Sequence, residues 1–179
     1  VCILTEGQDN WAAAFGSFMI ARQAGYDIEF QSASQPLRKS SLYLMPSVAE
    51  GSPISRQRWL ELLDEVRRGA GLYISLGGGI LSPFGEAVGV EVQTRSKRTS
   101  PAEFSVDGVK ALFKSKSPDV MALKAVTAKV LGHEKDGNPC FFENKLGKGR
   151  IWLLTFPVEQ ELAESPGAVC SKDAAPVWR

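Results

Sequence analysis

The chain has 179 residues, of which 44% are hydrophobic and 23% charged, so its length suits one domain with a full core and is short for two. Its 21 basic and 20 acidic side chains give a net charge of +1. That balance gives no electrostatic reason to expect nucleic acid or a membrane surface as a partner. No apolar stretch approaches the ~20 residues that a membrane-spanning helix needs.

The three cysteines are an odd number without CxxC spacing, which indicates neither a disulfide framework nor a zinc site. We expect Cys2, Cys140 and Cys170 to be reduced thiols that are buried or half-buried. The chain starts inside an apolar strand at Val1 and ends at Arg179 without an obvious stopping point. We therefore expect this chain to be a piece of a longer protein. The cellular location of that protein stays open, with the cytoplasm slightly favoured.

Strand and helix patterns alternate along residues 1–90. Asp9 or Asn10 can cap a first helix, which we expect to end at Gly25. A second helix has apolar residues at helical spacing, including Trp59 and Leu62. The expected strands cover residues 1–4, 26–30, 41–46 and 71–76, and the expected helices cover residues 11–24 and 54–68. This alternation predicts an α/β fold of the flavodoxin-like kind, a parallel sheet with helices on both faces.

From residue 91 the pattern changes to short β-type segments. We expect a hairpin turn at residues 134–138 and another tight turn at residues 147–149. The expected strands cover residues 90–94, 102–106, 124–131, 140–144 and 150–156. We interpret residues 91–160 as a β-rich elaboration on the sheet of residues 1–90, so that residues 1–179 form a single domain.

Ligands of doubly wound sheets bind at the carboxyl ends of the strands. The loops predicted there contain residues 6–11, 46–51 and 77–82. If this edge binds a ligand, the candidate residues are Glu6, Trp11, Ser47, Gly77 and Gly78. The first strand is not followed by GxGxxG, and the single histidine and dispersed acids favour no metal site, so we expect neither a cofactor nor a metal.

No catalytic set emerges from these loops. The only histidine, His133, falls in the late hairpin region, and no cysteine lies at a strand–helix elbow. Ser82, followed by Pro83, resembles a helix cap more than a GxSxG nucleophile. Glu6 and Glu50 could form the carboxylate pair of a glycosidase, but we favour local hydrogen bonding for the first and a solvated loop for the second.

Two tryptophans offer a different kind of binding group. Trp11 and Trp59 could each stack on a sugar or on a partner surface. Their helical spacing makes them core or interface residues first.

Three stretches of the chain carry a family resemblance. They are residues 4–11 (LTEGQDNW), residues 42–47 with 59–75, and residues 136–139 with 144–153, which contain the closing GKGRIWL strand. In these stretches the domain resembles the class I glutamine-amidotransferase-like fold as used in the β-galactosidase trimerisation domain and related accessory domains of glycoside hydrolases. Residues 157–168 also suit a hydrolase chain that continues further.

The resemblance implies a role without catalysis. True amidotransferases place a nucleophilic cysteine after the strand equivalent to residues 72–76, whereas this chain has Gly-Gly-Gly-Ile at residues 77–80. The implied function is a noncatalytic accessory domain of a glycoside hydrolase, in oligomerisation or in packing against the catalytic barrel. The implied partners are the catalytic domain of the same chain, a second copy of the chain, and carbohydrate.

Two alternatives stay open. One is a small hydrolase or amidotransferase relative that uses Glu6 with Ser82 or a cysteine. The other is a carbohydrate-binding module with Trp11 or Trp59 as its platform.

Overall fold

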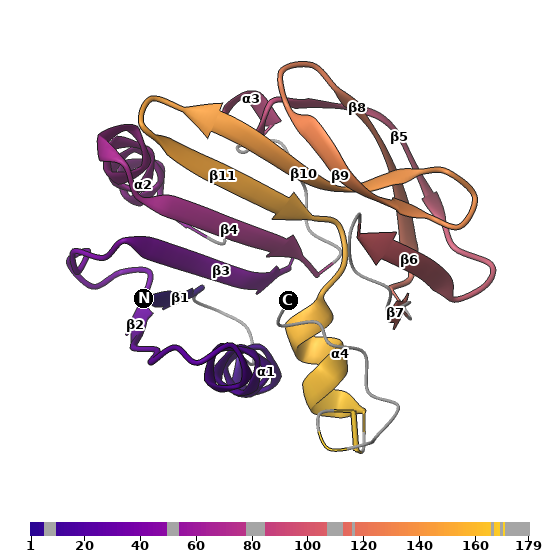
Figure 1. Cartoon of the computed structure of the whole chain (residues 1–179), viewed down its shortest axis with the longest axis horizontal. Helices are drawn as coiled ribbons and strands as arrows, with labels where there is room; N and C mark the ends of the chain where they lie inside the picture. The colour runs from indigo at the N-terminus through magenta and orange to yellow at the C-terminus, as the bar shows by residue number, and fades with distance from the viewer. Residues whose placement is uncertain are drawn as a thin grey trace.

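The computed structural model describes residues 1–5, 10–49, 54–77, 85–106, 113–115, 117–165, 167–168 and 170 (Figure 1). The helices in these ranges are α1 (Trp11–Gln23), α2 (Arg56–Arg68), α3 (Gly85–Val88) and α4 (Val158–Glu164). The strands are β1 (Cys2–Leu4), β2 (Phe30–Ser32), β3 (Leu42–Val48), β4 (Gly71–Leu76), β5 (Val90–Lys97), β6 (Ala102–Val106), β7 (Phe113–Ser115), β8 (Asp119–Ala125), β9 (Lys129–Glu134), β10 (Pro139–Leu146) and β11 (Gly149–Leu154).

Nine of these strands form one large mixed sheet in the order β2-β1-β3-β4-β11-β10-β9-β6-β7. Strands β2, β1, β3, β4 and β11 run parallel, and the sheet continues from β11 through β7 by antiparallel pairing. Strands β5 and β8 pair separately as a two-stranded antiparallel ribbon. The α/β class is therefore confirmed, with a strand-rich sheet, while the flavodoxin-like description with helices on both faces stays a prediction.

Three expected boundaries are wrong. The expected strand over residues 124–131 is two strands, because the amides of Val126, Thr127 and Ala128 all donate to the carbonyl of Gly89 and turn the chain between β8 and β9. The expected strand over residues 26–30 is displaced to β2, which pairs with β1. Pro46 does not end β3, because a register shift between Met45 and Val48 accommodates a residue that cannot donate to the ladder.

The core consists of two clusters of hydrophobic side chains, and alternate residues of β4 belong to different clusters. Leu72 and Ile74 pack with Leu62 of α2 in the first cluster, whereas Tyr73 packs against the second. The second cluster contains Val158 and Leu162 of α4 with residues of β6, β10 and β11 and with Phe156, whose ring stacks on that of Phe104 at 4.5 Å between centroids. Residues 157–168, which we expected only to suit a continuing chain, thus supply a helix that completes the core.

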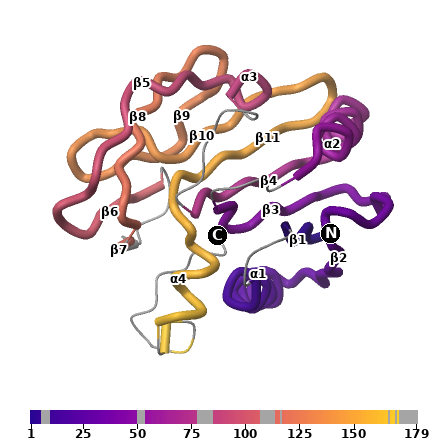
Figure 2. Tube along the Cα trace, turned by 180° about the vertical axis from the view of Figure 1, so that it is seen from behind, coloured from indigo at the N-terminus to yellow at the C-terminus, as the bar shows by residue number. Residues whose placement is uncertain are grey.

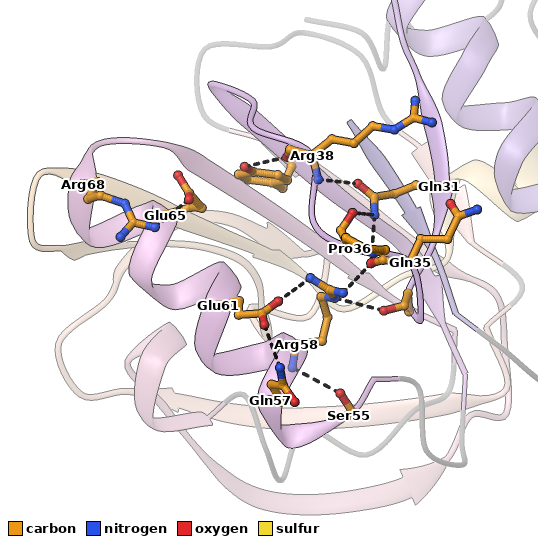
Figure 3. A network of polar contacts seen from close by, with 12 residues as sticks. Gln31, Gln35, Pro36, Arg38, Ser55, Gln57, Arg58, Glu61, Glu65 and Arg68 are labelled. Carbon is orange, nitrogen blue, oxygen red and sulfur yellow. Dashed lines mark hydrogen bonds and ion pairs between the residues drawn. The ribbon is translucent and has the colours of Figure 1, made fainter.

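A buried arginine fixes α2 to the connection between β2 and β3 (Figure 3). The Arg58 guanidinium donates from Nε to the carbonyl of Ala33 at 3.0 Å, from Nη2 to the carbonyl of Gln35, and from Nη1 to the carboxylate of Glu61. Ser55 caps the helix by accepting from the Arg58 amide at 3.1 Å. The first turn of α2 is therefore held beside the carboxyl ends of the parallel strands.

Candidate functional site

The structure describes three of the five residues that the sequence proposed as ligand-binding. Ser47 lies near the end of β3, Gly77 directly follows β4, and Trp11 begins α1. Glu6 and Gly78 lie outside the described residues, as do Glu50 and Ser82. Of the three described residues, the structure brings Ser47 and Gly77 together and leaves Trp11 on the surface.

Ser47 is buried and has the unusual backbone φ of 50°. Such a positive φ is uncommon for a residue other than glycine. Here it turns the Ser47 amide toward Ser75, whose Oγ accepts a hydrogen bond at 2.6 Å. The Ser47 Oγ donates to the Glu159 carboxyl group at 3.1 Å and accepts from the Gln160 amide at 3.3 Å. Each of these hydrogen bonds therefore points into the protein.

Gly77 lets the ends of β3 and β4 approach each other. Its amide donates to the carbonyl of Val48 at 2.7 Å. A Cβ atom at this position would lie 2.7 Å from the carbonyl oxygen of Ser47, closer than Cβ atoms normally come to any other atom. Glycine fits at residue 77 because the backbone of β3 packs directly against it.

Glu159 of α4 is the central residue of the site, and the sequence did not single it out. Its side chain is only 3% exposed and accepts from Ser75 Oγ at 2.5 Å and from Ser47. The Tyr73 side chain lies near the same carboxyl group. Burial raises the pKa of Glu159 above its ordinary value, and these hydrogen bonds offset part of that rise. Burial and the neighbouring Glu159 likewise raise the pKa of Tyr73.

A glycine contact with α1 sets the position of Glu159. Helices α1 and α4 lie side by side, as Figure 1 and the reverse view in Figure 2 show. A Cβ atom at Gly16 of α1 would lie 2.0 Å from the carbonyl oxygen of Glu159, so the two backbones can touch only because residue 16 lacks one. The first turn of α4 thus contacts both α1 and the ends of β3 and β4.

Two of the three cysteines, Cys2 and Cys140, are poor candidates for a nucleophile. All three are free, and Cys2 and Cys140 are buried, as expected. Burial raises the pKa of Cys2 to about 12 and also raises that of Cys140, which keeps both thiols protonated at neutral pH. Cys170 is exposed, so the expectation of burial is wrong for this residue. His133 lies exposed on β9, which β10 and β11 separate from β4.

The hydroxyl groups of Ser47 and Ser75 are buried and hydrogen-bonded to Glu159, so this arrangement is suited to holding α4 in place.

Within the described ranges, no group of three or more histidine, cysteine or acidic side chains could hold a metal ion. Of the helices that the structure describes, none has the length and apolarity to cross a membrane.

The tryptophans have opposite environments. Trp59 is buried in the first core cluster, as its helical spacing predicted, and this ends its candidacy as a sugar platform. Trp11 is 72% exposed and stacks on Phe15, with 5.7 Å between ring centroids. Phe18 is exposed on the same helix. We call Trp11, Phe15 and Phe18 the α1 aromatic face.

Neither a family model nor a curated protein matches the sequence. Solved structures do match the fold. Exo-β-1,4-mannosidase Op5Man5 from Opitutaceae bacterium strain TAV5 is 14% identical, with a TM-score of 0.77 over 97% of this chain and 32% of that one. Alpha-L-fucosidase isoenzyme 2 from Paenibacillus thiaminolyticus is 12% identical, with a TM-score of 0.70 over 99% of this chain and 31% of that one.

A catalytic mutant of Gan42B, a GH42 β-galactosidase from G. stearothermophilus, is 15% identical, with a TM-score of 0.65 over 91% of this chain and 28% of that one. The chain therefore spans about a third of the length of these glycoside hydrolases. At such low identity the likeness shows the fold: this chain is folded like one part of each of the three proteins.

Proposed function

We propose that this chain is a noncatalytic accessory domain of a multidomain glycoside hydrolase, acting in oligomerisation or in packing against the catalytic barrel. The observation that carries the proposal is the extent of the match: nearly all of this chain corresponds to about a third of the mannosidase and of the fucosidase. Most of each of those chains therefore lies outside the matching part. The proposed partner is the catalytic domain of the same chain.

The internal geometry of the strand ends supports a role without catalysis. At the ends of β3 and β4, the side chains of Ser47, Ser75 and Glu159 are buried and hydrogen-bonded to one another. A nucleophilic serine needs a base beside it and access to substrate. The hydrogen bonds instead hold α4 against the sheet.

The finer fold assignment is also part of the proposal. We infer a class I glutamine-amidotransferase-like, flavodoxin-like core for the parallel half of the sheet. Its five parallel strands occur in the order β2-β1-β3-β4-β11, which corresponds to the flavodoxin-like order 2-1-3-4-5. In this assignment, β10, β9, β6 and β7 extend the core on the far side of β11.

The exposure of Trp11 favours one second candidate, a carbohydrate-binding role. An exposed indole can stack on a sugar ring, although its stacking on Phe15 also suits a protein contact. Titration with oligosaccharides followed by tryptophan fluorescence would test this candidate, with Trp11→Ala as the matched variant. A response that survives this substitution would contradict it.

The main proposal is tested by comparing the 179-residue chain with the natural gene product that contains it. Both would be assayed on aryl β-mannosides, β-galactosides and α-fucosides. We expect turnover by the gene product and none by the chain alone. Turnover by the chain alone would refute the noncatalytic role, and a gene product that cleaves no glycoside would refute the hydrolase assignment.

A further inference from the structure

Helix α1 is apolar on two faces. Ala13, Gly16 and Ser17 are buried on its inner face. On the outer face Phe15 is 37% and Phe18 42% exposed, and the sequence contains no charged residue from 11 to 21. A helix that is apolar all round is normally buried. The α1 aromatic face is therefore expected to be covered in the working protein.

The spacing of the exposed side chains indicates what covers them. Trp11, Phe15, Phe18 and the exposed Arg22 follow one another at intervals of four, three and four residues. This alternation of four and three is the repeat by which one helix packs along another at a small crossing angle. A second helix is therefore the occupant that fits the α1 aromatic face.

The same residues are complementary to themselves. In an antiparallel pair of α1 helices, a single register places Trp11 opposite Arg22 of the other copy and Phe15 opposite Phe18. A guanidinium over an indole is a favourable cation–π contact, and facing phenyl rings form a favourable aromatic pair. Each contact occurs twice, as two-fold symmetry requires. We propose that the α1 aromatic face binds the α1 helix of a second copy of this chain, antiparallel across a two-fold axis.

The size of this surface sets the expected strength of the dimer. A helix of 13 residues is about 20 Å long. Paired α1 helices alone bury less than the roughly 800 Å² per partner of a standard interface. Exposed Tyr26, just beyond the helix, can add to the contact. We therefore expect a reversible dimer that assembles at micromolar concentrations.

The inference rests on the oligomerisation role proposed above and names its partner, but its test needs no hydrolase activity. Sedimentation velocity of the 179-residue chain from about 1 to 200 µM should show a monomer–dimer equilibrium. Phe15→Glu, which places a carboxylate at the centre of the contact, should raise the dissociation constant at least tenfold. Val126→Glu, at an exposed apolar residue between β8 and β9, is the matched control and should leave it unchanged.

A wild-type chain that stays monomeric at 200 µM, or a dimer that Phe15→Glu leaves intact, would overturn the proposal. A Val126→Glu substitution that weakens the dimer as much as Phe15→Glu does would also overturn the proposal. These failures leave the noncatalytic role and the hydrolase assignment untouched, because the glycosidase comparison tests those two separately.

The register has its own test. Arg22 is ion-paired with Asp27 in its own chain. Arg22→Gln should weaken the dimer about five- to thirtyfold, the range expected for the loss of two exposed cation–π contacts, whereas Asp27→Asn, which keeps the guanidinium, should not weaken it. In a Cys170→Ser background, a mixture of Phe15→Cys and Phe18→Cys chains should cross-link to each other faster than either does alone. Equal cross-linking within each variant would refute the antiparallel register.

Discussion

Glu159→Gln is the most informative change at the strand ends, because it keeps the shape of the side chain and removes its titration. Burial raises the pKa of Glu159 above its ordinary value of 4.5 in the folded chain, and the unfolded chain loses this effect. At a pH between the pKa of Glu159 in the unfolded chain and its higher pKa in the folded chain, the folded state binds more protons than the unfolded state. The contribution of Glu159 to stability is therefore fully present below pH 4.5 and is lost as the pH rises through the folded pKa.

The change of this stability with pH is limited, because a single group releases a single proton. A single site can change the free energy of unfolding by at most about 1.4 kcal/mol per pH unit. The Glu159→Gln variant has no such slope, so its stability relative to wild type should rise with pH, and the difference should level off above the folded pKa of Glu159. Glu159→Ala should instead cost about 2–5 kcal/mol, because it leaves two buried serine hydroxyls without their acceptor and opens a cavity.

Urea unfolding monitored by circular dichroism at intervals from pH 4.5 to 8.5 measures both effects. Glu164→Gln is the matched control, because Glu164 is exposed on the same helix and accepts one side-chain hydrogen bond, from Gln160. We expect this control to change stability by less than about 0.5 kcal/mol. A wild-type chain that gains stability relative to Glu159→Gln as the pH rises would refute the reasoning, because it would show a carboxylate stabilised in its charged form.

Three further changes test the packing around the site. Leu62→Ala removes a fully buried α2 side chain and should cost about 2–5 kcal/mol in urea unfolding, whereas Leu60→Ala, at an exposed residue of the same helix, should cost less than about 1 kcal/mol. Arg58→Gln withdraws donors from the carbonyls of residues 33 and 35 and should cost about 2–5 kcal/mol, with faster hydrogen exchange in α2. Gly16→Ala should lower the melting temperature, because overpacking against the Glu159 backbone outweighs the gain of about 1 kcal/mol in helix propensity; a higher melting temperature would contradict the α1–α4 contact.

Much of the fold could be predicted because local interactions determine it. Helix α2 follows from its apolar spacing and ends at Arg68, as expected, before Gly69, whose φ of 129° few other residues adopt. The hairpins after β9 and β10 turn at Gly137 and Gly147, both with positive φ. By contrast, the break between β8 and β9 depends on the distant carbonyl of Gly89, which no local pattern contains.

The candidate site was predictable only in its location. The rule that ligands bind at the carboxyl ends of parallel strands led to Ser47 and Gly77, which do lie together there. Glu159 was missed because acidic residues are rarely buried without a paired cation, and a polar segment after Pro157 has the composition of a surface tail. Its partners lie 84 and 112 residues earlier in the chain, so only the folded structure reveals them.

The two helices beside the strand ends together explain why we place the function on the surface of this domain. Glu159 fixes α4 to the ends of β3 and β4, and Gly16 lets α1 pack directly on α4. The inner faces of both helices are thereby used to close the fold, and a ligand at these strand ends would have to displace a hydrogen-bonded carboxyl group. The outer face of α1 carries exposed aromatic rings instead of charges. Because Glu159 occupies the ends of β3 and β4, we expect the exposed aromatic rings of α1 to make the contact with another protein.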